Sequence, residues 1–343
     1  MVSVAVLAIG CLAAQPSAAQ DYWPGETWRT SAPEAQGIDA AVLGRIDEYV
    51  KKSFPYMSSV LIVRGGFIVF EKYYQGGQDD PRSQYSVTKS LMSALTGIVI
   101  GQGSIESPQS EAYRYMPDAL RAAMGPAAKT ITVRHLLTHT SGLGDTMGAG
   151  EIEPALLAAS LGSGLRSAPG TEFAYNGNNP NLLSAMITHV SGLRASELAR
   201  KYLFDRIGVT RVGWEEGSRW TAGYTGASLA TRDMARLGYL FLRQGRWNGE
   251  QVVPKEWVAE STRRQVPIPF HYQTPGIDDA HGYGWWTMQY DGHAAFAAIG
   301  YAGQRICVIP DLDLVIVFTG TGGGFDVEHL PIIRDCIVAS IRR

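Results

Sequence analysis

The chain has 343 residues, of which 18% are charged and 45% are hydrophobic, as in a folded globular protein and unlike a disordered one. The 30 basic and 32 acidic residues leave a formal charge of −2, so there is no basic excess for binding nucleic acid or an anionic membrane. Only 3 cysteines are present and none has a CxxC or Cys/His metal spacing, which excludes a zinc site and a disulfide scaffold.

The first residues of the chain predict export. Residues 2–14 are apolar and uncharged, but this run is too short to span a bilayer comfortably. Ser17 and Ala19 follow at the spacing of the small residues that a signal peptidase recognises, although no basic residue precedes the apolar run. We interpret residues 1–19 as a signal peptide and expect a periplasmic or secreted protein that is not held in the membrane after cleavage. Lipid attachment at Cys11 is a weaker alternative, because the usual lipoprotein Leu is missing ahead of it.

The remaining chain predicts strands near both ends and helices between them. Apolar residues recur at helical spacing from Asp39 to Lys52, and two strands, Ser59–Val63 and Phe67–Tyr74, then flank a hairpin turn. Three more strands are predicted only near the end of the chain, at Ala294–Ile299, Gln304–Ile309 and Leu314–Thr319. A closing helix follows over about 331–341. The helices predicted in the long middle segment are Leu91–Ile100, Asn181–Val190, Ala195–Ile207 and Thr231–Arg243.

This order of elements predicts an α+β fold in which a mostly helical lobe is inserted into a sheet lobe. We assign one domain to residues 20–343. The sheet lobe takes about 36–85 and 280–343, and the helical lobe takes about 86–279. Clefts between such lobes are common ligand sites.

The first chemical motif is Ser86-Val87-Thr88-Lys89, which opens the apolar run that ends at Ile100. Residues three apart share one face of a helix, so the Lys89 amine can reach the Ser86 hydroxyl. A serine alcohol is a weak nucleophile that needs an adjacent base, and a lysine can be that base only if burial depresses its pKa. The alternative is a surface serine and lysine on an ordinary helix, and the apolar run argues against it.

Two later segments can complete such a site. Tyr175 lies in a polar loop and can relay a proton beside a Ser–Lys pair, with an aromatic core residue as the alternative. Gly300 and Tyr301 lie on a strand with several small residues, where a substrate can approach the backbone closely. The Tyr301 N–H can pair there with the N–H of Ser86 as an oxyanion hole, and an edge-strand bulge is the alternative.

Ser86-x-x-Lys89, then Tyr175, then a glycine-containing strand before Pro310 resemble the serine β-lactamase-related hydrolases. That family includes class C β-lactamases, D-stereospecific peptidases, family VIII-type esterases and 6-aminohexanoate-dimer hydrolase. Four further segments look like its signatures, at 131–143, 169–173, 231–238 and 283–286. The resemblance covers roughly 36–343 and implies an antiparallel sheet flanked by N- and C-terminal helices, beside a mostly helical lobe. It also implies Ser86 as the nucleophile and Lys89 and Tyr175 as the proton-transfer pair.

Two departures from the lactamase pattern favour esters and linear amides. Lactamases of this type usually have Tyr-x-Asn, whereas Gly177 stands two residues after Tyr175, which leaves Asn176 or Asn178 to supply the amide. The lactamase Lys-Thr-Gly is replaced by 298–300, Ala-Ile-Gly, which offers no cation for a β-lactam carboxylate. Losing such a charge-assisted contact costs about 1.5–3 kcal/mol.

The remaining candidates are residues that can contact the substrate. We expect Trp286 to form an apolar wall of the acyl pocket, with packing between the lobes as the alternative. Gly300 and Asn178 are further candidates, and so is His329 in the loop after the last strand. Of the other histidines, we expect His135 and His139 to have structural roles. We expect His281 to lie on a surface loop, with a place in the lining of the cleft as the alternative.

We therefore predict an exported serine hydrolase that cleaves carboxylic esters or linear amides through a Ser86 acyl-enzyme, with no metal or organic cofactor. Its partner is a small-molecule ester or amide, and the sequence does not determine the oligomeric state. A β-lactamase or D,D-peptidase is the alternative within enzymes. A catalytically idle binding protein of the cell envelope is the alternative from another class.

Overall fold

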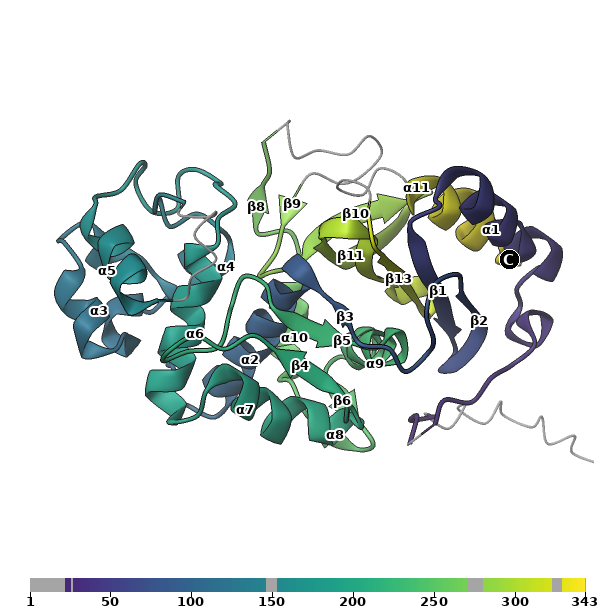
Figure 1. Cartoon of the computed structure of the whole chain (residues 1–343), viewed down its shortest axis with the longest axis horizontal. Coiled ribbons are helices and arrows are strands. Elements are labelled where there is room, and N and C mark those ends of the chain that lie inside the picture. The colour runs from purple at the N-terminus through teal and green to yellow at the C-terminus, as the bar shows by residue number, and fades with distance from the viewer. Residues whose placement is uncertain (1–21, 26, 146–152, 270–279, 323–328, 343) are drawn as a thin grey trace, which may run out of the picture.

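The computed structural model describes residues 22–25, 27–145, 153–269, 280–322 and 329–342. In these ranges an eight-stranded antiparallel sheet has the strand order β2-β1-β13-β12-β11-β10-β9-β8 (Figure 1). Its strands are β1 (Met57–Arg64), β2 (Phe67–Tyr73), β8 (Val266–Pro267), β9 (Ala280–His281), β10 (Trp286–Tyr290), β11 (His293–Gly300), β12 (Gln304–Ile309) and β13 (Leu314–Gly320). The predicted strands and the α+β class are confirmed. The strands β8, β9 and β10, which extend the sheet toward the helical lobe, were missing from the prediction.

The central strands are apolar throughout because both faces of the sheet are covered. Leu61 of β1 pairs with Val317 of β13, and the adjacent pair is Ile62 with Ile316. Successive residues of a strand point to opposite faces, so the two pairs lie in different hydrophobic cores. One core continues into the helical lobe, and the other lies beneath the terminal helices.

Helices from both ends of the chain cover the second core. Helix α1 (Ala40–Ser53) begins after Asp39, whose carboxylate accepts hydrogen bonds from two N–H groups of the first turn. It packs against the C-terminal segment, which contains α11 (His329–Pro331), a π-helical turn (Ile332–Ile337) and a 3-10 turn (Val338–Ser340). Figure 1 shows this layer above the sheet at one end of the molecule. The predicted closing helix is therefore present but irregular.

The helical lobe occupies the other end of the molecule in Figure 1. The helices described between residues 86 and 279 are α2 (Thr88–Gly101), α3 (Asp118–Ala123), α4 (Val133–Leu137), α5 (Pro154–Gly162), α6 (Asn178–Ser191), α7 (Ala195–Ala199), α8 (Asp205–Ile207), α9 (Thr231–Leu242) and α10 (Lys255–Ser261). Short strands form two small sheets: β3 (Arg82–Ser83), β5 (Ala227–Leu229) and β4 (Val212–Trp214) in one, and β6 (Arg246–Trp247) and β7 (Glu250–Gln251) in the other.

Two helices of this segment differ from the prediction. The single helix predicted over Ala195–Ile207 is divided by a π-helical turn, Arg200–Phe204, between α7 and α8. Helix α9 packs across β13 and β12, so it covers the large sheet although it falls inside the stretch assigned to the helical lobe. The apolar stripe of α9 must pack against another apolar surface, and the large sheet provides that surface.

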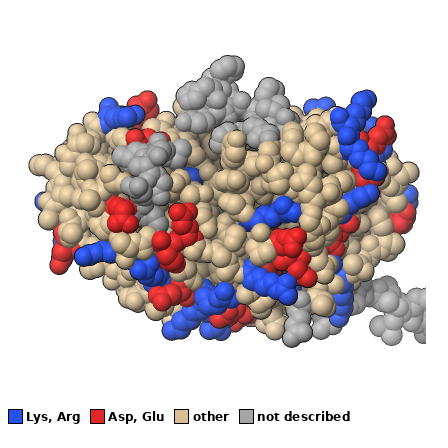
Figure 2. Space-filling model, viewed as in Figure 1, with Lys and Arg blue, Asp and Glu red and all other residues tan. Residues whose placement is uncertain are grey.

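Figure 2 shows basic and acidic side chains interspersed on the face in view, in keeping with a formal charge of −2. Across the described ranges, no helix is both long and apolar enough to span a bilayer. The segment interpreted as a signal peptide, including Cys11, lies outside the described residues, so export stays a prediction.

Candidate active site

Ser86 and Lys89 lie at the junction between a 3-10 turn and α2. The turn spans Tyr85–Val87 and runs directly into the helix, which places Lys89 in its first turn. The Lys89 Nζ donates a hydrogen bond to Ser86 Oγ at 3.0 Å and another to the carbonyl of Tyr224 at 2.8 Å. The contact that the Ser-x-x-Lys spacing predicts is therefore present.

Lys89 is buried deeply enough to change its protonation. The residue is 5% exposed because α2 is buried along almost its whole length. Burial lowers the pKa of the Lys89 ammonium from 10.5 to about 7, while the Asp145 carboxylate acts in the opposite direction. A neutral amine beside Ser86 Oγ is the form that can accept the serine proton.

Tyr175 lies against the same amine. The Lys89 Nζ is 4.7 Å from the centroid of the Tyr175 ring, and the His139 ring lies 4.6 Å from that ring, centroid to centroid. Trp286 is another aromatic neighbour of Tyr175, with ring centroids 5.8 Å apart. The three side chains predicted to be catalytic thus come together at the start of α2, although they come from segments about 90 residues apart.

The end of β11 presses against the turn that carries the nucleophile. A Cβ on Gly300 would lie 2.4 Å from the Gln84 carbonyl oxygen and 3.3 Å from the Ser86 backbone nitrogen. Only glycine permits this approach, which holds the backbone of Tyr301 next to that of Ser86. Gly300 was predicted as a substrate contact. The space in which a Gly300 Cβ would lie is taken by this backbone, so the glycine allows β11 to approach the turn of Ser86. Its contact with a substrate stays a prediction.

The two tyrosines that flank this junction are exposed. Among the described residues they are the large hydrophobic side chains most open to solvent, with Tyr85 at 37% and Tyr301 at 48%. Their rings make an edge contact at 5.5 Å. Two exposed aromatic rings therefore lie beside the backbone groups of the candidate oxyanion hole.

An apolar wall stands on the Tyr175 side of the site. Phe173, Val266 and Ile268 form a small buried cluster, against which Tyr175 and Trp286 pack. Trp286 opens β10 and lies 6.4 Å from Phe173, ring to ring. This place suits the predicted wall of an acyl pocket, and the role stays a prediction.

Two predicted substrate contacts have structural partners. The Asn178 amide donates to the carbonyl of Gly144 at 2.7 Å and to the hydroxyl of Ser160 at 2.9 Å, and the residue is buried. His329 is also buried, and its ring stacks on Phe318 at 4.3 Å. Phe318 belongs to the core beneath α1, on the sheet face opposite Ala298 and the strand end at Gly300. Among the described contacts, neither side chain touches Ser86, although the His329 ring lies close to Gly303 in the turn that begins at Tyr301. Their contact with a substrate stays a prediction.

Two histidines that were not predicted as site residues, His139 and His281, lie beside Tyr175 and Trp286. His281, predicted on a surface loop, is buried and its ring lies 5.0 Å from Trp286 and 5.4 Å from His139. Burial lowers the pKa of His281 to about 3. Burial is also the largest cause that lowers the pKa of His139 well below its ordinary value, and repulsion from His281 and Lys89 in their protonated forms acts in the same direction. Both imidazoles are therefore neutral at pH 7, so they place no additional positive charge beside Lys89.

The sequence analysis also missed Asp145, the carboxylate that raises the pKa of Lys89, and Asn181. The Asn181 side-chain oxygen accepts hydrogen bonds from Gly223 N–H at 2.8 Å and Tyr224 N–H at 3.3 Å. It thereby fixes the loop whose carbonyl binds Lys89. The Asn-Asn-Pro-Asn run at the start of α6 was a usable signal, because so many amides at one buried helix start need partners.

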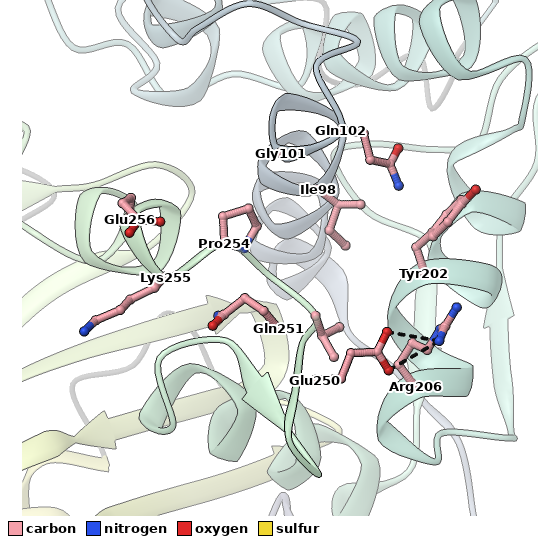
Figure 3. A pocket seen from close by; sticks show the side chains of 11 residues that line it. Ile98, Gly101, Gln102, Tyr202, Arg206, Glu250, Gln251, Pro254, Lys255 and Glu256 are labelled. Atoms are coloured by element: carbon pink, nitrogen blue, oxygen red, sulfur yellow. Dashed lines mark hydrogen bonds and ion pairs between the residues drawn. The ribbon is translucent and has the colours of Figure 1, made fainter.

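A pocket of about 500 Å³ lies at the other end of α2 (Figure 3). It includes Ile98 and Gly101, about 14 and 18 Å along the helix axis from Lys89. Two of its four charged residues, Arg206 and Glu250, bind each other at 3.0 Å. No nucleophile–base pair is among its lining residues, so it is not the reaction site. Within the described part of the chain, no group of three His, Cys, Asp or Glu is placed to hold a metal ion.

Comparison with known proteins gives the family. The profile of the Beta-lactamase family matches residues 43–335. The chain belongs to the Beta-lactamase family. Together with the Ser86–Lys89 pair, this makes it a serine hydrolase.

Similar proteins span the classes that the sequence resembles. The chain is 26% identical over 308 residues to a 6-aminohexanoate-dimer hydrolase of Paenarthrobacter ureafaciens, which covers 82% of this chain and 77% of that protein. Among solved structures, EstCE1, described as a hydrolase with promiscuous acyltransferase activity, aligns with a TM-score of 0.70 at 16% identity over 87% of this chain and 98% of its own. A penicillin-binding protein homologue from Caulobacter crescentus aligns with a TM-score of 0.70 at 14% identity over 89% and 99%. These structural likenesses establish the fold.

Proposed function

We propose that this serine hydrolase cleaves carboxylic ester or linear amide bonds of small molecules through an acyl-enzyme on Ser86. The observation that carries the proposal is the buried Lys89 amine, 3.0 Å from Ser86 Oγ and against the Tyr175 ring. The similarity to a 6-aminohexanoate-dimer hydrolase supports the linear amide, and the likeness in fold to EstCE1 is compatible with the ester.

In the first half of the proposed reaction, Ser86 Oγ attacks the substrate carbonyl carbon while its proton passes to the Lys89–Tyr175 pair. The N–H groups of Ser86 and Tyr301 stabilise the negative charge that develops on the carbonyl oxygen. The leaving group then departs with a proton from Tyr175, which leaves the acyl group on Ser86. In the second half a water molecule gives a proton to the pair and attacks the acyl-enzyme, and Ser86 recovers its hydroxyl proton as the acid is released.

The neighbourhood of Ala298 favours neutral substrates over β-lactams. Ala298 is fully buried on the sheet face that leads to Ser86, so it presents no cation to a substrate carboxylate. Arg305 is buried on β12 and donates to the Tyr290 hydroxyl at 3.2 Å. Arg305 is the register partner of Phe318 on the neighbouring strand β13, so both side chains lie on the sheet face beneath α1, opposite the face that leads to Ser86. A β-lactamase or D,D-peptidase therefore remains the second candidate.

The test compares three reagents on the purified protein: a fluorophosphonate probe, p-nitrophenyl acetate and a chromogenic cephalosporin. We expect Ser86 to be labelled and kcat/KM for the ester to exceed that for the cephalosporin by more than about 150-fold, the largest effect of one missing charged contact. Ser86→Ala should abolish labelling and turnover. Ser90→Ala is the matched control, because Ser90 lies one turn along the same buried helix and binds the Gly284 carbonyl at 2.6 Å.

Two results would contradict the proposal. Efficient cephalosporin hydrolysis by the wild-type protein would assign it to the lactamase branch. A protein that neither reacts with the probe nor turns over either substrate would be the idle binding protein of the cell envelope. Export is proposed separately, from residues 1–19 alone, and is tested by N-terminal sequencing of the protein recovered from periplasm and medium.

A further inference from the structure

His139 holds the chain on both sides of Tyr175. Its carbonyl accepts a hydrogen bond from the N–H of Ala174 at 2.8 Å, and its Nδ1 accepts one from the N–H of Asn176 at 3.3 Å. Its ring packs against the Tyr175 ring at 4.6 Å, with the planes inclined by 36°. We propose that His139 is a positioning residue for Tyr175, which sets the hydroxyl for protonation of the leaving group.

This contact requires a neutral imidazole. Nδ1 can accept a hydrogen bond only when it carries no proton, and in the neutral ring the proton is then on Nε2. His139 is 2% exposed, among His281, Phe173 and Tyr175, with the Lys89 ammonium as the nearby cation. Charging the ring there would bury a second cation beside Lys89 and remove the acceptor for Asn176. The surroundings therefore keep the acceptor available.

The backbone of His139 shows that its place is tightly determined. Its φ is +56°, in the left-handed region that non-glycine residues rarely adopt. Such a conformation persists only where surrounding contacts impose it. Here the contacts are those to Ala174 and Asn176, and a third comes from Asn179, whose amide nitrogen lies 3.4 Å from Nδ1.

The consequence for catalysis depends on the leaving group. An alkoxide or an amine must receive a proton as it departs, whereas p-nitrophenolate departs without one. A Tyr175 hydroxyl displaced by about 1 Å costs on the order of 100-fold in rate where the proton transfer is needed. This inference rests on the proposed function, because it assumes that Tyr175 is the proton donor.

The experiment compares ethyl butyrate with p-nitrophenyl butyrate. Both esters form the same acyl-enzyme, so a difference in kcat/KM between them reports acylation alone. We expect His139→Ala to lower kcat/KM about 100-fold for the ethyl ester and less than about tenfold for the p-nitrophenyl ester. Tyr175→Phe should show the same selectivity. Probe labelling of Ser86 should persist in both variants, which tests the proposed function separately.

Two amide substitutions refine the test. Asn places its oxygen near the Nδ1 position and tolerates the left-handed conformation, whereas Gln places its oxygen near Nε2. We expect kcat/KM for ethyl butyrate to be at least about tenfold higher in His139→Asn than in His139→Gln. If His139→Ala does not fold, this pair carries the test.

His135 supplies the matched control. It lies four residues earlier in the same motif, and its Nδ1 also accepts a backbone hydrogen bond, from Thr132 at 3.2 Å, but it caps α4. His135→Ala should lower the melting temperature without changing the ratio between the two esters. Equal losses on both esters in His139→Ala, or no loss on either, would overturn the inference while leaving the Ser86 acyl-enzyme intact.

Discussion

Lowering the pH from 7 to 6 should reduce kcat/KM for p-nitrophenyl acetate about fivefold, because the reaction needs the neutral amine of Lys89. Burial places the pKa of Lys89 at about 7, so about half of the amine is neutral at pH 7 and about one-eleventh at pH 6. Raising the pH from 7 to 8 increases the neutral fraction less than about twofold. The expected profile therefore rises with pH and levels off above about pH 8.

The buried histidines do not account for such a profile. Burial lowers the pKa of His281 to about 3, so His281 stays neutral from pH 6 to 9. Burial also lowers the pKa of His139 well below its ordinary value, away from the midpoint expected for Lys89. The assay is initial-rate hydrolysis at constant ionic strength, with Ser86→Ala as the blank at each pH and circular dichroism to confirm folding. Lys89→Arg keeps the charge but cannot lose its proton, and should be nearly inactive.

Two shapes of the profile would refute the reasoning. A lysine with the ordinary pKa of 10.5 would make kcat/KM rise about tenfold per pH unit up to pH 9 without levelling. A flat profile would show that the base is another group. Near-normal turnover by Lys89→Arg would lead to the same conclusion.

Three further changes test the electrostatics and the packing of the site. Asp145→Asn removes the carboxylate that raises the pKa of Lys89, so the midpoint of the pH–rate profile should move to lower pH. An unchanged or higher midpoint would show that Asp145 does not raise the pKa of Lys89. Lys89→Met should raise the melting temperature, and more at pH 6 than at pH 9. The pKa of Lys89 is about 7 in the folded protein and 10.5 when the lysine is exposed, so unfolding takes up a proton between these two pH values. Burial of the amine therefore lowers the free energy of unfolding most below pH 7, by up to about 5 kcal/mol. Equal melting temperatures of the two proteins at pH 6 would contradict the burial penalty. Gly300→Ala brings a Cβ to within 2.4 Å of the Gln84 carbonyl oxygen. The backbone must then shift, which should displace the oxyanion hole at Ser86 and lower kcat about 100-fold. A small change in kcat would show that the oxyanion hole lies elsewhere.

The sequence alone was sufficient wherever the determining interactions are local. Ser86 and Lys89 are three residues apart at a helix start, so their contact follows from helix geometry whatever the rest of the chain does. The five predicted strands have long apolar runs, and Asp39 caps α1 through bonds to its own first turn. The order of the motifs was enough to indicate the family that residues 43–335 match.

Only the tertiary structure decided where the loop side chains point and which of them are buried. Asn178 was predicted at the substrate, but its amide binds Gly144 and Ser160 from a distant segment. His281 was predicted at the surface, but it is buried against His139 and Trp286 from other elements. Burial depends on contacts between segments far apart in the chain, and local spacing carries no information about them. The lowered pKa of Lys89 has the same origin, because the strength of desolvation depends on everything packed around α2.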